Sequence, residues 1–221
     1  NSDGSEEEMC GNGIRCFAKY VYDHKMVAEK TFSIEIMAGI MIAKVHTDSE
    51  DKVSLVTVNM GKPFLERSEI PMEGPSGHVC GEPLEVGGVT YRITSMRMGV
   101  PHTMIYAADA EAVNLAELGP KFELHPRFPR KTNMNFIQVI NRHTIKVRTW
   151  ERGAGITLAC GTGACSCVVG SYLNGFTDRS VDVQMPLGIL HVDYDESQGV
   201  YMTGPAAYVY EGEWRKNHDQ K

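Results

Sequence analysis

Two short segments of this chain share the pattern cysteine, glycine, any residue, glycine, and each leads into a run of small and apolar residues. The first covers residues 10–13 (Cys-Gly-Asn-Gly) and the second covers residues 160–163 (Cys-Gly-Thr-Gly). Unpaired amides at a helix start carry partial positive charge, which favours the thiolate form of a cysteine placed there. One copy alone is typical of a tight turn with a buried thiol. Two copies predict two similar halves, each presenting one reactive cysteine.

Strand patterns dominate the rest of the chain. Helical spacing predicts helices over residues 11–23, 109–118 (capped by Asp109 and ended by Gly119-Pro120) and 163–173. We expect strands over 33–46 (a hairpin turning at Ala38-Gly39), 53–59, 84–86, 89–94, 103–107, 135–140, 144–150, 181–185, 189–192, 200–202 and 207–210, and loops over 69–82 and 151–157. Many strands with three helices predict a mixed α/β (α+β) fold with mostly antiparallel sheets, not a doubly wound parallel sheet.

Charge and hydropathy exclude several classes of protein. The formal net charge is −6, from 28 acidic and 22 basic residues, and the basic residues form no cluster, so we expect no nucleic-acid partner. No apolar run approaches the roughly 18–20 residues of a membrane span, so we expect no membrane partner.

The six cysteines are too sparse for a disulfide framework, which favours reduced thiols in the cytoplasm. Cys16, Cys165 and Cys167 fall in predicted helices and are interpreted as core residues, and Cys80 as a loop residue. Cys160, Cys165 and Cys167 lack the short Cys-x-x-Cys pairing of common zinc sites, so we expect no metal.

Two thiols at helix starts, facing each other across one substrate, form a plausible acid/base pair. One thiolate removes a proton from a carbon next to a carboxylate, and the other thiol donates a proton to the opposite face. Open amides after each cysteine would hold the carboxylate and stabilise charge on its oxygens. The expected result is inversion at that carbon.

Several motifs together resemble diaminopimelate epimerases. They are residues 1–6 (Asn-Ser-Asp-Gly-Ser-Glu), 9–15 (Met-Cys-Gly-Asn-Gly-Ile-Arg), 151–155 (Glu-Arg-Gly-Ala-Gly) and 159–165 (Ala-Cys-Gly-Thr-Gly-Ala-Cys). The resemblance runs from Asn1 to about Trp214. Asn12, between the two glycines of the first motif, favours this family over the proline racemases, which resemble it in fold and in using a cysteine pair.

The resemblance implies a role for each matching residue. Cys10 and Cys160 would be the acid/base pair, with His102 and Glu151 tuning the cysteines. Gly11, Asn12, Gly161 and Thr162 would bind the reacting amino-acid end. Asn1, Asn133 and Arg152 would hold the distal end of the substrate, and Glu151 would take its ammonium group. Arginine suits such a clamp because its guanidinium pairs with a carboxylate through two hydrogen bonds.

The same resemblance implies an isomerase that interconverts LL- and meso-2,6-diaminopimelate in lysine and peptidoglycan precursor biosynthesis. Such an enzyme uses no pyridoxal phosphate or other cofactor, and its only ligand is the small-molecule substrate. The family also suggests a homodimer in the cytoplasm. Its fold has two pseudo-symmetric domains, each a curved sheet around a central helix. Here these would be residues 1–62, with 206–221 returning to them, and residues 63–205.

Two departures from the family pattern stand out. Val100 replaces an asparagine that many relatives carry, which removes one donor to the distal end of the substrate. The chain also opens at Asn1 without methionine, so we expect an amino-terminal portion of the first domain to be missing.

Two alternatives stay open at this point. One is a racemase of proline or hydroxyproline, and the other is a redox or metal-binding protein built on the cysteines. A substrate panel would distinguish the first from an epimerase, since a small cyclic substrate has no use for Arg152. Metal analysis and a thiol titration would distinguish the second.

Overall fold

A computed structural model describes residues 9–37 and 39–212 of the chain. This part contains three α-helices, one short 3₁₀-helix (η1) and twelve strands. In chain order they are α1 (Gly11–Asp23), β1 (Thr31–Ile36), β2 (Gly39–Thr47), β3 (Val53–Asn59), η1 (Arg67–Glu69), β4 (Val79–Val86), β5 (Val89–Met98), β6 (Val100–Tyr106), α2 (Leu115–Glu123), β7 (Asn133–Asn141), β8 (Thr144–Glu151), β9 (Gly155–Thr157), α3 (Gly161–Leu173), β10 (Ser180–Met185), β11 (Gly188–Asp195) and β12 (Gly199–Pro205).

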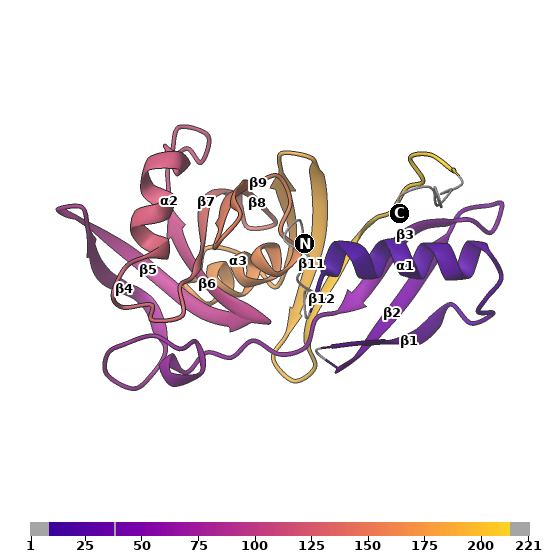
Figure 1. Cartoon of the computed structure of the whole chain (residues 1–221), viewed down its shortest axis with the longest axis horizontal. Helices are drawn as coiled ribbons and strands as arrows, with labels where there is room; N and C mark the ends of the chain where they lie inside the picture. The colour runs from indigo at the N-terminus through magenta and orange to yellow at the C-terminus, as the bar shows by residue number, and fades with distance from the viewer. Residues whose placement is uncertain (1–8, 38, 213–221) are drawn as a thin grey trace, which may run out of the picture.

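All twelve strands belong to one curved sheet, which runs the length of the elongated molecule (Figure 1). Its order is β1-β2-β3-β12-β11-β10-β8-β7-β6-β5-β4, with β9 paired to β8. Within the described residues, β6 pairs with β7 and β8 with β10 in parallel, and the other pairs are antiparallel. The mixed α/β class with a mostly antiparallel sheet is therefore confirmed.

The two cysteine-led helices occupy different environments. Helix α1 packs one face on β2 and β3, and its opposite face is exposed at Phe17 and Tyr20. Helix α3 is buried on nearly all sides, from Gly161 through Ser171, because strands from β5 to β12 wrap around it (Figure 1). A helix made of small and apolar residues on every face is suited to such a position.

One hydrophobic core joins these two helices. It contains Ile14 and Ala18 of α1, Ala164 and Val168 of α3, and Met202 of β12, all with relative exposure below 5%. Strand β12 lies between β11 and β3 and so connects the first and last thirds of the chain. The division into domains 1–62 with 206–221 and 63–205 stays a prediction.

The predictions with strong local signals are confirmed. Helix α1 covers the predicted residues 11–23, and α3 begins two residues before the predicted start. The hairpin at Gly87-Gly88 joins β4 to β5, with Val86 paired to Val89. Strands β1 and β2 also pair as a hairpin, although its turn residue Ala38 lies outside the described residues.

A helix is present where one was predicted over 109–118, but both of its predicted ends are wrong. Helix α2 covers Leu115–Glu123 and contains both Gly119 and Pro120, which were interpreted as its end. Gly119 serves close packing instead, because a Cβ at this position would lie 2.2 Å from Cδ2 of Trp150. Neither the sequence spacing nor the Gly-Pro pair reveals a contact with a residue so distant in the chain.

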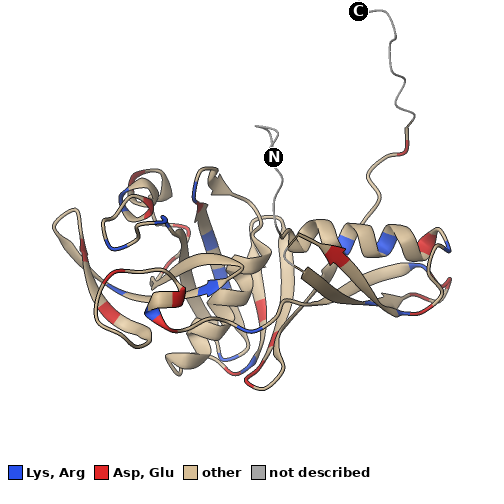
Figure 2. Cartoon of the chain, turned by 60° about the horizontal axis from the view of Figure 1, so that its bottom comes forward, with Lys and Arg blue, Asp and Glu red and all other residues tan. Residues whose placement is uncertain are grey.

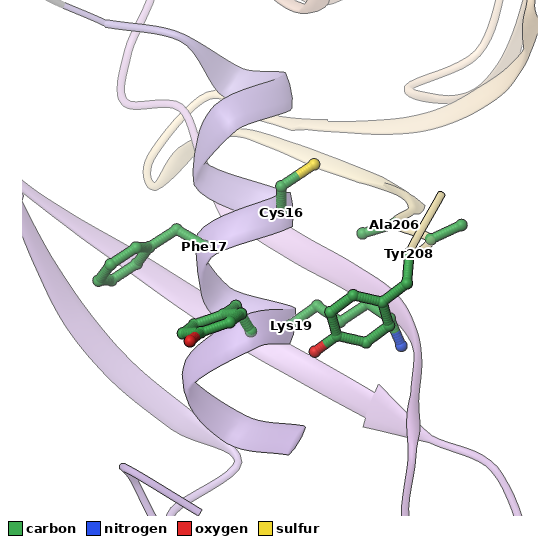
Figure 3. Close-up of a pocket in the computed structure, with 7 residues that line it drawn as sticks. Cys16, Phe17, Lys19, Ala206 and Tyr208 are labelled. Carbon is green, nitrogen blue, oxygen red and sulfur yellow. The ribbon is translucent and has the colours of Figure 1, made fainter. Parts of the chain in front are cut away.

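The prediction of a strand over 207–210 is also wrong, because the ladder of β12 with β3 ends at the pair Pro205–Leu55. Beyond it, residues 206–208 lie beside α1 and line a pocket there (Figure 3). The Tyr208 ring lies 5.0 Å from Nζ of Lys19, and its hydroxyl lies 3.4 Å from Nδ1 of His24.

Both predicted loops contain strand residues. Strand β4 begins at Val79, inside the expected loop 69–82, so Cys80 is a strand residue. Residues 155–157 form β9 inside the expected loop 151–157 and pair with β8. These residues form strands because the fold places a partner strand beside them, and the local sequence gave no sign of that partner.

Charged residues of both signs are interspersed along the ribbon in both halves of the molecule (Figure 2). In the part of the chain that the structure describes, no helix has the length and apolar character needed to cross a bilayer.

Candidate active site

The starts of α1 and α3 converge on one side chain of the sheet, Met202 in β12. A Cβ built on Gly11 would lie 2.8 Å from Cε of Met202, and one built on Gly161 would lie 3.0 Å from its Sδ. Oδ1 of Asn12 lies 3.9 Å from the same position on Gly161. Helices α1 and α3 lie roughly end to end along the molecule (Figure 1). The tertiary structure therefore brings the two cysteine–glycine segments together, although 146 residues separate Gly13 from Cys160 in sequence.

Cys10 caps the amino terminus of α1. Its backbone is extended, its carbonyl accepts from the Ile14 amide at 3.0 Å, and its sulfur accepts from the Gly13 amide at 3.4 Å. This bond satisfies one of the free amides of the first turn. The Cys10 side chain is exposed, so a substrate can reach it.

Cys160 occupies the equivalent position on α3 but is buried, with 5% relative exposure. Burial, and then the negative charge of Glu151, raises the pKa of the Cys160 thiol to about 12. Hydrogen bonding from Thr162 and from the Gly163 amide opposes this rise in pKa. The Thr162 hydroxyl lies 3.6 Å from the Cys160 sulfur. At neutral pH, Cys160 is therefore a neutral thiol in the unliganded protein.

His102 lies beside the second cysteine segment and is fully buried. Its Nε2 is 3.0 Å from the Thr162 hydroxyl, and its Nδ1 is 3.2 Å from the amide nitrogen of Asn135. Burial, with a smaller effect from the positive charge of Arg152, lowers the pKa of His102 to about 3. The ring is therefore neutral near neutral pH.

Glu151 and Arg152 follow one another where β8 ends, so both lie at the same edge of the site. The negative charge of Glu151 raises the pKa of Cys160, and the positive charge of Arg152 lowers the pKa of His102. Asn133 holds this turn in place, since its Oδ1 accepts from the Arg152 amide at 2.8 Å. The guanidinium donates to the Arg130 carbonyl at 3.0 Å. Among the described residues, neither Glu151 nor Arg152 forms an ion pair with another side chain, and a hydrogen bond between Glu151 and the Cys160 thiol contributes to the raised pKa of that thiol.

The predicted site residues thus gather in one region wherever the structure describes them. Oδ1 of Asn12 is buried without a hydrogen-bond partner among residues 9–37 and 39–212, which leaves it available to a donor on a substrate. Asn1 lies outside the described residues. Within those residues, no group of three or more His, Cys, Asp or Glu side chains is arranged to hold a metal ion.

Comparison with known proteins identifies the family. The sequence profile described as diaminopimelate epimerase matches residues 1–65 and 94–209. The chain is 54% identical over 214 residues to the diaminopimelate epimerase of Pelotomaculum thermopropionicum, with 97% of this chain and 76% of the relative covered. This chain belongs to the diaminopimelate epimerase family. The diaminopimelate epimerase of Heliobacterium modesticaldum is 51% identical, with coverage of 96% and 76%.

Solved structures of proteins other than diaminopimelate epimerases share the fold of this chain. A probable proline racemase from Agrobacterium radiobacter superposes with a TM-score of 0.64 at 13% identity, covering 90% of this chain and 65% of the racemase. A PhzF-family phenazine biosynthesis protein from Bacillus anthracis superposes with a TM-score of 0.57 at 16% identity, covering 94% and 76%. At such low identity these likenesses concern the fold alone.

The remaining cysteines of this member of the diaminopimelate epimerase family divide into buried and exposed groups. Cys165 and Cys167 are fully buried on α3, as expected of core residues. Cys16 is exposed, which contradicts its interpretation as a core residue, because it lies on the side of α1 that faces the pocket in Figure 3. Helical periodicity predicted the helix but did not separate its faces at this position.

Sequence reasoning missed several residues that lie in or beside this candidate site. Arg15 is 8% exposed, and its guanidinium reaches the Pro205 carbonyl at 3.2 Å and the Met202 sulfur at 3.8 Å. Asn135 is buried and contacts His102, and Thr149 is buried and contacts Asn135. Asn135 carried one usable signal, since it is a polar residue inside an otherwise apolar strand segment.

Proposed function

We propose that this protein interconverts LL-2,6-diaminopimelate and meso-2,6-diaminopimelate, with Cys10 and Cys160 as the two proton-transfer groups. The observation that carries the proposal is the convergence of the two cysteine-capped helix starts on Met202, in a chain of the diaminopimelate epimerase family. The free amides at the two helix starts suit the α-carboxylate, because helix amino termini favour bound anions.

The two thiols divide the work at one carbon. One thiolate takes the α-proton, so that a C–H bond breaks and an S–H bond forms. The opposite thiol then gives its proton to the other face, so that its S–H bond breaks and a C–H bond forms. Charge that develops on the carboxylate during this exchange is stabilised by the helix-start amides. The protein needs no net supply of protons or electrons for this sequence.

The environments of the thiols support an assignment for the resting state. Burial and Glu151 hold the pKa of Cys160 at about 12, so Cys160 starts the cycle as the acid. Cys10, which is exposed and within reach of a substrate, is then the partner that takes the α-proton in this direction. In the reverse direction Cys160 must act as the base, and the hydrogen bond from Thr162 helps it to carry the negative charge.

The experiment is deuterium uptake at the α-carbon in heavy water, measured by mass spectrometry on the full-length protein. We expect LL- and meso-diaminopimelate each to acquire one α-deuterium on inversion, without added pyridoxal phosphate. L-Proline and hydroxyproline serve as comparison substrates. Exchange of either cyclic amino acid, with none of diaminopimelate, would contradict the proposal.

Arg152 and Glu151 are proposed to hold the distal end of the substrate, together with Asn133 and Asn1. We expect Arg152→Met to raise the KM for diaminopimelate by about 10- to 100-fold, the range that follows from losing a hydrogen-bonded charge partner. The hydrogen bond from the Arg152 backbone amide to Oδ1 of Asn133 does not involve the Arg152 side chain, so the variant keeps it. Steady-state kinetics in both directions provide the measurement.

The matched control is Arg148→Met on strand β8, which ends one residue before Arg152. Arg148 pairs with Glu111, which is half exposed, at 2.7 Å, and such surface pairs contribute little. We expect the KM of the Arg148→Met variant to stay within about twofold of the KM of the unchanged protein. Equal KM values for the Arg152 and Arg148 variants would remove Arg152 from the proposed clamp.

The proposal extends to two properties suggested by the family resemblance. We propose a homodimer, which multi-angle light scattering of the purified protein tests directly. We also propose a role in lysine and peptidoglycan precursor synthesis in the cytoplasm, where the reducing environment keeps both catalytic thiols free.

A further inference from the structure

A continuous series of hydrogen bonds leads from strand β8 to the sulfur of Cys160. The Thr149 hydroxyl lies 3.0 Å from Oδ1 of Asn135, and Nδ2 of Asn135 lies 3.2 Å from Nδ1 of His102. Nε2 of His102 lies 3.0 Å from the Thr162 hydroxyl, which lies 3.6 Å from the Cys160 sulfur. Thr149, Asn135 and His102 are all buried, with at most 5% relative exposure.

The backbone fixes which way the Asn135 amide points. The Thr103 carbonyl lies 3.4 Å from Nδ2 of Asn135, and a carbonyl oxygen can only accept a hydrogen bond. The atom facing it must therefore be the NH₂ group, and the Thr149 hydroxyl donates to the amide oxygen on the other side. A Cβ on Gly163 would lie 2.8 Å from that oxygen, so the glycine of the second motif is what admits Asn135 to this position.

The Asn135 amide in turn selects the tautomer of His102. An NH₂ group has no lone pair to offer, so Nδ1 of His102 must accept and carries no proton. Burial lowers the pKa of His102 to about 3, so the ring is neutral and its single proton lies on Nε2. That N–H donates to the Thr162 hydroxyl oxygen. With its oxygen accepting, Thr162 has one proton left, and the Cys160 sulfur is the acceptor within reach.

We propose that Asn135 is a positioning residue for the reaction, because it holds His102 as the Nε2–H tautomer and so directs the Thr162 hydroxyl proton at the Cys160 sulfur. The inference rests on the proposed function, in which Cys160 becomes a thiolate once in each cycle. A thiolate receives this bond only while His102 donates to Thr162. With the other tautomer, Thr162 would donate to His102 instead, and the thiolate would lose a partner.

Other charged and titratable groups also act on Cys160, and the test leaves them unchanged. They are Glu151 on β8, Cys165 and Cys167 on α3, and Arg152 through His102. From α1, Arg15 faces Cys165 and Cys10.

The test compares the unchanged protein with Asn135→Asp, whose carboxylate can only accept and therefore favours a proton on Nδ1 of His102. Nitrogen-15 NMR of the histidine ring reads the tautomer directly and without substrate, with the His102 signals assigned by their loss in His102→Asn. We expect the Nε2–H form in the unchanged protein and the Nδ1–H form in the variant. We expect kcat in the variant to fall by about 10- to 100-fold, the range for losing a hydrogen bond to a charged group.

A double-variant cycle separates positioning from a general structural effect. Thr162→Val removes the hydroxyl, and if Asn135 acts through Thr162 then Asn135→Asp costs nothing further on that background. Asn141→Asp adds the same charge at the exposed end of β7 and keeps an acceptor for the His143 amide, so we expect kcat and the His102 tautomer to be unchanged.

Each outcome decides the matter. An Nδ1–H tautomer in the unchanged protein overturns the inference, even if Asn135→Asp does not fold. In the Asn135→Asp variant, a changed His102 tautomer with full kcat would also overturn the inference. So would a proton kept on Nε2 of His102, whatever the value of kcat. Additive losses of kcat in the double-variant cycle would overturn it as well. Failure of the proposed function looks different, because the unchanged protein would then show no α-deuterium uptake from diaminopimelate whatever the tautomer.

Discussion

Replacing either Cys10 or Cys160 with alanine is expected to lower the turnover of diaminopimelate by about 10²- to 10⁴-fold, the range for loss of a positioned acid or base. In the proposed mechanism, each thiol acts as base in one direction and as acid in the other. Either substitution therefore slows both LL-to-meso and meso-to-LL conversion. Coupled assays in each direction, with deuterium uptake measured in parallel, give the result.

The remaining cysteines provide matched controls on the same helices. Cys16→Ala changes an exposed thiol on α1, and Cys167→Ala changes a buried thiol on α3. We expect turnover by the Cys16 variant to match the unchanged protein. The Cys167 variant is expected to lose a little stability, because a small cavity forms, while it keeps its activity. Full turnover and full deuterium uptake in both Cys10→Ala and Cys160→Ala would show that the two-thiol mechanism is wrong.

Gly199→Ala is expected to lower the free energy of unfolding by about 2–6 kcal/mol, since it combines backbone strain with a steric clash. Gly199 has φ +105°, and a Cβ there would lie 2.4 Å from the Gly61 carbonyl oxygen. That oxygen accepts from the Val200 amide at 2.9 Å, and the Met60 amide donates to the Val200 carbonyl at 2.8 Å. The clash therefore falls on the backbone that joins β12 to the end of β3. Urea unfolding followed by circular dichroism gives the difference.

Gly88→Ala separates the two causes. Gly88 has φ +81° in the β4–β5 hairpin, and nothing lies within 4 Å of a Cβ built there. Its substitution carries strain alone, for which we expect about 1–2 kcal/mol. If both variants lost the same stability, the approach of β12 to residue 61 would not be a constraint on the fold. Because a typical domain has only about 5–15 kcal/mol of stability, the Gly199 variant is also expected to unfold at a clearly lower temperature than the unchanged protein.

Local signals in the sequence predicted the elements on which the site is built. Cys10 and Cys160 stand where their helices begin, because an extended residue before a run of helix-forming residues becomes the cap. The hairpin at Gly87-Gly88 followed from the positive φ that such turns need. The motifs around both cysteines also identified the family, since they depend on short contiguous stretches of chain.

Predictions that depended on distant neighbours failed. Gly119 and Pro120 have the chemistry of a helix end, but contact with Trp150 places Gly119 inside α2. Tyr208 lies in a segment with strand character, yet the ladder ends at Pro205 and the ring lies against α1. Cys16 was interpreted as a core residue because it falls inside a predicted helix, and only the packing of α1 on β2 and β3 shows that it is exposed.

By itself, the sequence determined that two cysteines each begin a helix, that strands outnumber helices, and which residue types surround each thiol. The tertiary structure decided that both helix starts meet at Met202, that Cys10 is exposed while Cys160 is buried, and that Asn135 faces His102. The physical reason is the range of the interactions. Capping and turn formation depend on residues within about four positions. Burial, pKa and histidine tautomer depend on atoms that only the folded sheet brings together.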